Sequence, residues 1–166
     1  MATEAEVGGT TSSPEIYPSL MEMYKMGLRK LVPMSRFGNP IGVPSIDENG
    51  KLVVDEKGNP KYSWTTIYEN PRYWTEERLE KQSADFKDGI GVCLGDIGLK
   101  DEQGILYDNI LDIDSDAVWD KLFVLQNPGP KCSLIKKIYE EGCVIRTRKP
   151  KGRHIHWLSH KQYPIL

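Results

Sequence analysis

One stretch of the sequence constrains the fold more than any other. In the run from Ile105 to Asp114, the central residues are apolar at both alternating sets of positions. Because side chains alternate between the two faces of a strand, such a strand must be covered by other layers on both sides. We therefore predict a central strand here. Helical and extended patterns alternate around it, which indicates an α/β or α+β domain.

The chain has 166 residues, which suits one domain with its own core. Residues 1–13 are small and polar and lack the apolar segment of a signal peptide, so we expect a disordered tail, a domain over 14–166 and a cytoplasmic location. No apolar stretch approaches the ~20 residues of a membrane helix, so no membrane partner is expected. Three widely spaced cysteines argue against a disulfide scaffold.

The remaining elements are expected from periodicity and capping signals. Gly, Pro and Asn cluster between 35 and 61, which predicts a hairpin insertion there. The other expected elements are helices over 18–26, 75–86, 115–126 and 131–141, and strands over 28–34, 90–94, 143–147 and 154–158.

Charge is unevenly distributed along the chain. No Asp or Glu follows Glu141, and the segment after it carries six Lys and Arg residues. The net charge of −2 therefore leaves −8 for the first 141 residues. A basic end on an acidic body is typical of contact with an anionic partner, although a solvated positive face is the alternative.

Two acids close the central run, in the order Ile-Leu-Asp112-Ile-Asp114. Residues two apart on a strand share a face, so both carboxylates point the same way and repel each other. A divalent cation relieves this repulsion, and Mg²⁺ prefers such oxygen ligands. The alternative is that the strand simply ends and Asp114 or Ser115 caps the next helix. The apolar run leading directly into the acids favours a metal site.

A basic loop near the C-terminus leads into a strand that bears histidines. Lys151 and Arg153 flank Gly152, and a loop of this kind can grip a chain of phosphates. His154 and His156 share one strand face beside it. We expect His154, Arg153 and Lys151 to face one cleft, with His156 as the second choice for the contact. The alternative is a solvated basic hairpin followed by a strand with a packed histidine.

The order of these motifs resembles the bifunctional DNA primase/polymerase N-terminal (prim-pol) domain of the archaeo-eukaryotic primase superfamily. The resemblance covers most of the chain. Its elements are a helix, Gly and strand over 24–33, a Gly/Pro loop over 37–40 followed by Trp64, the segment 89–95, the Asp112-x-Asp114 strand and the Gly152-x-His154 strand.

The resemblance implies a primase-polymerase-like fold, in which helices flank a central mixed sheet related to the RNA-recognition-motif core. In this family the residues matching Asp112 and Asp114 bind the catalytic metal, Mg²⁺ or Mn²⁺. The residue matching His154 contacts the phosphates of the incoming nucleotide, and Gly152 occupies the small-residue position two before it. The expected catalytic residues are therefore Asp112, Asp114 and His154.

The implied activity is template-dependent nucleotidyl transfer by a DNA primase/polymerase. Its partners are nucleoside triphosphates and single-stranded or primed DNA, with a replicative helicase as a further partner. Metal ions activate the attacking hydroxyl, and pyrophosphate leaves.

One feature departs from the family pattern. Its third motif is a further carboxylate on a strand after the histidine strand, and this sequence has no acid after Glu141. Either the domain is C-terminally incomplete, or Asp116 or Asp108 stands in for that acid, or the protein is not a complete polymerase.

Three other functions remain open at this point. A haloacid-dehalogenase-like phosphatase also begins with an apolar strand ending in Asp-x-Asp. A metal hydrolase using both acids and both histidines would suit Zn²⁺ or Mn²⁺. A degenerate primase-like domain would bind single-stranded nucleic acid, without polymerase activity, through the basic hairpin and Trp157.

Overall fold

The structure is a computed structural model that describes residues 17–119, 138, 140–147 and 152–163. It is an α+β protein with short helices and small antiparallel sheets. Its elements are α1 (Leu20–Lys25), β1 (Leu31–Pro33), β2 (Val43–Pro44), β3 (Tyr62–Ser63), α2 (Thr65–Glu69), α3 (Glu76–Lys81), the 3₁₀ turn η1 (Ser83–Phe86), β4 (Ile90–Val92), β5 (Gly95–Asp101), β6 (Gly104–Ile113), α4 (Asp116–Trp119), β7 (Cys143–Arg146) and β8 (Arg153–Ser159).

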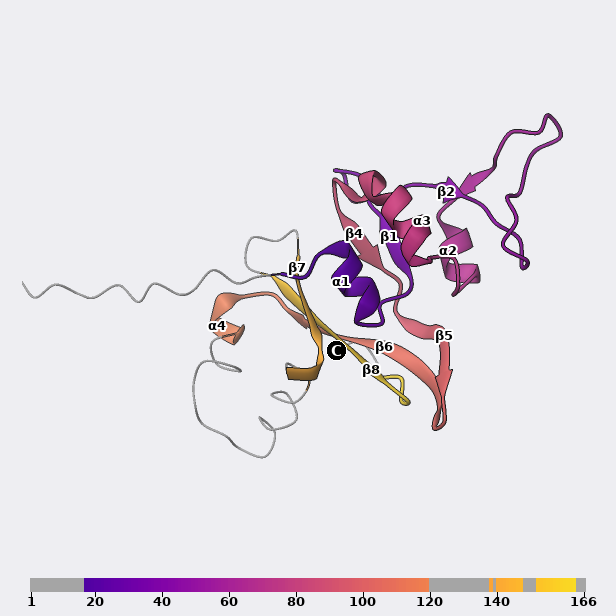
Figure 1. The fold of residues 1–166 in the computed structure, drawn as a ribbon. Helices are drawn as coiled ribbons and strands as arrows, with labels where there is room; N and C mark the ends of the chain where they lie inside the picture. Colours follow the sequence, from indigo (N-terminus) through magenta and orange to yellow (C-terminus); the bar gives the residue numbers. More distant parts are fainter. Residues whose placement is uncertain (1–16, 120–137, 139, 148–151, 164–166) are drawn as a thin grey trace, which may run out of the picture.

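The largest sheet has four strands in the order β5-β6-β8-β7, and each neighbouring pair is antiparallel. β5 and β6 form a hairpin, and the Asp101 carboxylate accepts hydrogen bonds from two backbone N–H groups of its turn, at 2.8 and 3.1 Å. β6 and β8 lie side by side through the centre of the sheet (Figure 1). Their register runs from Tyr107 opposite Ser159 to Ile113 opposite Arg153.

A second sheet pairs β1 with β4 and carries the larger core. Helices α1 and α3 contact each other beside this sheet (Figure 1). Trp74 is buried in this core, and its Nε1–H donates to the Leu31 carbonyl at 2.7 Å. Leu79 on α3 and Phe86 on η1 pack into the same cluster. The bond from Trp74 fixes β1 against the segment that precedes α3.

The four-stranded sheet has apolar packing on both faces. Cys143 and Ile145 of β7 join the larger core. On the other face, Ile113 and Ile155 pack with Trp119 of α4 in a smaller core. Both Ile113 and Ile155 are almost fully buried, at 2% and 0% exposed. β6 lies inside this sheet, as its apolar pattern predicts, although most of its residues are half-buried rather than fully covered.

Most of the expected elements are confirmed near their predicted bounds. The first helix begins with a capping box between Ser19 and Glu22, and Thr75 caps α3 through a bond from the Arg78 backbone N–H. β6 is central, and β7 and β8 form the expected antiparallel pair. The insertion folds through isolated bridges such as that between Ile46 and Leu52.

The expected mixed sheet is wrong for the described strands. β6 follows β5 through a hairpin and β8 runs antiparallel to both of its neighbours, so each described pairing is antiparallel. β5 is not among the strands predicted from the sequence. It is a twisted edge strand with an irregular register, and Gly95 and Gly98 adopt positive φ angles of 96° and 70°. Such glycines interrupt the alternation by which strands are recognised.

Several expectations fall on residues that the structure does not describe. These are the tail over 1–13, most of the helices over 115–126 and 131–141, and the loop residue Lys151. Of the described helices, none combines the length and apolarity needed to cross a bilayer.

Candidate functional site

Two residues from distant motifs meet on the four-stranded sheet. Asp112 of β6 lies directly opposite His154 of β8 in the antiparallel register. The His154 Nε2 is 3.3 Å from the Asp112 Oδ1, and the two side chains are 33% and 40% exposed. The neighbours Ile113 and Ile155 point into the smaller core, so alternation turns this pair to the opposite face. The sheet therefore presents an acid and an imidazole together to solvent.

A second acid–histidine pair lies deeper on the same face. The His156 Nδ1 is 3.0 and 3.2 Å from the two carboxylate oxygens of Asp108, and the side chains are 2% and 0% exposed. The partners are diagonal, since His156 sits opposite Ile110 in the register. Burial raises the pKa of the Asp108 carboxyl, and the hydrogen bond and charge of His156 act against that rise. The pair is a buried polar contact inside an otherwise apolar region.

A pocket of about 560 Å³ lies between the two sheets. One wall comes from β4 and the loop before it, from Asp88 to Val92, with Met34 and Gly38. The other wall comes from the four-stranded sheet, with lining residues Ile110, Ile145, Thr147, His154 and His156. The volume is within the range of about 300–1,000 Å³ typical of small-molecule sites. Both histidines thus line one space.

Gly91 of β4 leaves room for the Met34 side chain at the pocket wall. A Cβ added at Gly91 would lie 2.9 Å from the Met34 sulfur, closer than real contacts allow.

The opposite wall holds an unsatisfied group, because the buried Thr147 Oγ1 has no hydrogen-bond partner among the described residues. Leaving such a hydroxyl unpaired costs about 1–3 kcal/mol. A polar ligand or a water in the pocket would remove that cost.

The remaining predicted residues lie outside this pocket. Arg153 is adjacent to His154 on β8, so it projects to the other face, where its Nη1 is 2.9 Å from the Asp116 Oδ1 and its guanidinium lies 4.4 Å from the Trp119 ring centre. The structure therefore does not bring Arg153 into the cleft expected for His154. Gly152 is buried, and its carbonyl accepts from the Thr147 backbone N–H at 2.9 Å.

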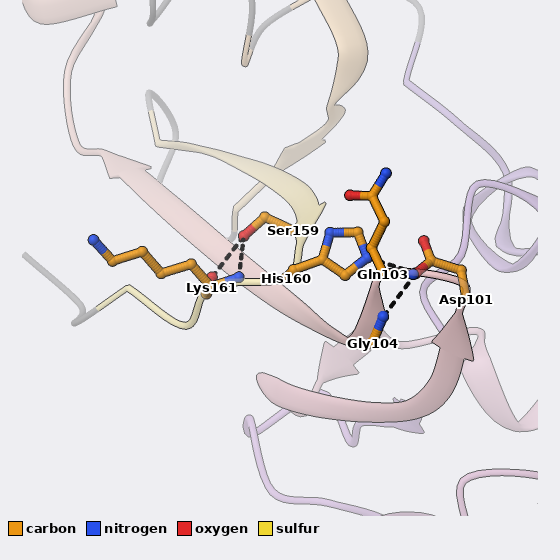
Figure 2. Close-up of polar contacts among 6 residues, drawn as sticks. All are labelled: Asp101, Gln103, Gly104, Ser159, His160 and Lys161. Atoms are coloured by element: carbon orange, nitrogen blue, oxygen red, sulfur yellow. Dashed lines mark hydrogen bonds and ion pairs between the residues drawn. The ribbon is translucent and has the colours of Figure 1, made fainter.

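A third acid–histidine pair marks the far end of the sheet. The His160 Nε2 lies 2.7 Å from the Asp101 Oδ1 at the β5–β6 turn (Figure 2). The hydrogen bond from His160 is the largest of the effects that hold the pKa of the Asp101 carboxyl below its usual value. Neither residue lines the pocket. Asp101 and His160 are therefore matched controls for the pair at the pocket.

Two exposed acids at the end of β6 are the candidate ligands for a divalent cation of the magnesium type. Asp114 follows directly after the end of β6, and both it and Asp112 are exposed. In the described part of the chain, no group of three or more His, Cys, Asp or Glu side chains is arranged around a common metal position. Mg²⁺ keeps several waters and is commonly held by one or two carboxylates together with substrate phosphates. Asp112 and Asp114 are the residues that could hold such an ion.

The sequence predicts Asp112 and His154 as site residues, and the structure pairs them, but the pairing of Asp108 with His156 is not predicted. Asp108 was considered only as a substitute for a third acid, and His156 only as a second-choice contact. The available signal was a charged residue inside a run that must be buried, since such residues are rarely buried without a partner.

Comparisons of the chain with family models, with curated proteins and with solved structures find no match.

Proposed function

We propose that the chain binds a nucleoside triphosphate at the mouth of this pocket and transfers its nucleotidyl group to a primer on DNA. One observation carries the proposal: the two motifs of the resemblance, Asp112-x-Asp114 and Gly152-x-His154, meet as a cross-strand pair beside a ligand-sized pocket. A structural role alone would not require an acid and an imidazole to share an exposed position next to a cavity.

The chemistry of the pair suits a triphosphate bound with a cation. Asp112 and Asp114 would hold Mg²⁺ or Mn²⁺, and the bound ion would neutralise phosphate charge and make the attacking hydroxyl more acidic. In the imidazolium form both ring nitrogens of His154 donate, so one N–H can face Asp112 while the other donates to a phosphate oxygen. That bond strengthens as charge develops on the phosphates. Asp112 also orients the imidazole through the contact at Nε2, at 3.3 Å.

Positioning comes from the sheet rather than from loops. The β6–β8 ladder fixes Asp112 and His154 at neighbouring positions, and the smaller core locks both strands from behind. Preorganised donors act without reorganisation at the moment of reaction, which is a major source of rate. Lys151 directly precedes Gly152 in the sequence and stays a predicted contact to the nucleotide phosphates, whereas Arg148 and Lys149 are proposed to contact the DNA backbone.

Primer extension tests the proposal with matched variants. We expect Asp112→Asn to abolish extension of a primed single-stranded template in Mg²⁺ or Mn²⁺, and His154→Ala to slow it by about 10²–10³-fold, the usual effect of removing one donor to a developing charge. The controls Asp101→Asn and His160→Ala change the same residue types at the far end of the sheet and should leave the rate unchanged.

Three other outcomes would overturn the proposal. Extension that survives Asp112→Asn would show that this acid is not part of the site. Nucleotide and DNA binding without any turnover would favour the degenerate binding domain. Release of phosphate from a simple ester, lost in Asp112→Asn, would favour the phosphatase.

A further inference from the structure

His156 is the most unusual residue of the pocket that the proposed chemistry leaves unused. It is 2% exposed and yet lines the pocket. Its Nδ1 is held by Asp108, and Asp108 is not among the lining residues. The ring therefore meets the pocket with the edge away from Nδ1. Within the described residues, the Nε2 has no hydrogen-bond partner.

The Asp108 carboxylate defines which groups suit this edge of the ring. Imidazole is a stronger base than a carboxylate, so Nδ1 donates to Asp108. Nε2 then accepts a hydrogen bond when the ring is neutral and donates one when the ring is charged. A ligand phosphate only accepts hydrogen bonds, and its charge would be repelled by the buried carboxylate. A hydroxyl both donates and accepts, so it suits Nε2 in either protonation state of the ring.

We propose that His156, oriented by Asp108, is the contact for a sugar hydroxyl of the bound nucleotide. This inference rests on the proposed function and extends it to a part of the substrate that His154 does not reach. The ring centres of His154 and His156 are 5.9 Å apart, so one small ligand can touch both. In a nucleotide the sugar hydroxyls are the neutral donors nearest to the phosphates. With phosphate at His154, the sugar edge is the part that meets His156.

The proposal accounts for why a polar pair is buried here. Asp108 and His156 require each other in an apolar region, where two well-packed apolar residues would be at least as stable. A polar pair at this position is explained if the His156 Nε2 binds a ligand. It also places a selective contact at the floor of the pocket, because a buried acceptor left unpaired discriminates against an analogue that lacks the hydroxyl.

Ligand-side substitution tests this without changing the protein. We expect the wild-type protein to bind ATP, dATP and 2′,3′-dideoxy-ATP, each with Mg²⁺, with affinities that fall by about three- to tenfold when the contacted hydroxyl is removed. In His156→Phe, which keeps a ring of similar size, this dependence on the hydroxyls should disappear. His160→Phe is the control and should retain it.

Nitrogen NMR of the imidazole rings separates the possible failures. The chain has three histidines, so three ring systems are observed and His160 is a built-in reference. We expect ATP to shift the His156 Nε2 and the His154 ring, and the dideoxy analogue to shift His154 alone. A shift of His154 with equal affinities for all three nucleotides would overturn the role of His156 and leave the proposed function intact. No shift at either residue, with no binding, would overturn both.

Discussion

The buried Asp108–His156 pair makes a sharp prediction for stability. Both side chains are almost inaccessible, and the described contacts give Asp108 no other charged partner than His156. Replacing His156 by Phe keeps the ring volume but leaves the carboxyl unpaired in the interior. Breaking one side of a buried pair costs about 3–5 kcal/mol, a large part of the roughly 5–15 kcal/mol that separates folded from unfolded protein.

The cost should depend on pH in a defined direction. Burial already raises the pKa of Asp108, and His156→Phe removes the hydrogen bond and charge that act against the rise. An acid whose pKa is higher in the folded state than in the unfolded state binds its proton more tightly when folded. The free energy of unfolding therefore falls as the pH rises from the unfolded pKa of about 3.9 toward the folded pKa. We therefore expect His156→Phe to be less destabilised at pH 5 than at pH 8.

A double variant isolates the unpaired charge. Asp108→Val combined with His156→Phe removes the ionisable carboxyl and should recover most of the loss, so the double variant is more stable than His156→Phe alone. Urea unfolding followed by tryptophan fluorescence, at pH 5 and pH 8, measures all three proteins and the wild type. A cost below about 1 kcal/mol that does not change with pH, or strictly additive effects of the two substitutions, would refute the reasoning.

Three further predictions concern single residues. Cys143 is 3% exposed, and burial raises the pKa of its thiol to about 11. At pH 8, iodoacetamide should therefore label Cys143 far more slowly in the native protein than in the unfolded protein. Equal labelling rates would contradict the burial. A Cβ at Gly142 would lie 2.8 Å from a backbone oxygen of β8. We expect Gly142→Ala to lower the free energy of unfolding in urea by about 1–3 kcal/mol. The control Gly42→Ala, whose Cβ would make ordinary 3.4 Å contacts, should lower it less. The pKa of Asp101 is lowered in the folded protein, so its carboxylate stabilises the fold above the pKa of the unfolded chain. This stabilisation is lost as the pH falls through the folded pKa, so the difference in unfolding free energy between wild type and Asp101→Asn should vanish in acid. A difference that grows on acidification would contradict this direction.

Local signals predicted the helix starts and the strand β6 because they depend on neighbouring residues. Ser19 and Thr75 are caps whose partners lie three residues away, and this spacing is visible in the sequence. β6 is recognisable because its apolar residues occupy both alternating sets of positions. The meeting of Asp112 with His154 followed from the resemblance, which orders the two motifs.

Contacts between side chains on different strands could not be predicted from the sequence. The partnership of Asp108 with His156 depends on the β6–β8 register, and a shift of one residue would turn every side chain to the other face. The predicted position of Arg153 is wrong because Arg153 and His154 are adjacent on one strand. Side chains of adjacent strand residues point to opposite faces, so the two cannot face one cleft. Its true partner, Asp116, lies at the start of α4, which local patterns do not place relative to β8.

We propose that Asp112, Asp114 and His154 form a site for a metal-bound triphosphate. A crystal structure with Mn²⁺ and a non-hydrolysable nucleoside triphosphate, with anomalous data at the manganese edge, tests it most directly. We expect a manganese peak within coordination distance of the Asp112 and Asp114 carboxylates, with a phosphate oxygen in hydrogen-bond contact with His154. A triphosphate bound away from β6 and β8, or a manganese peak held by other residues, would contradict it.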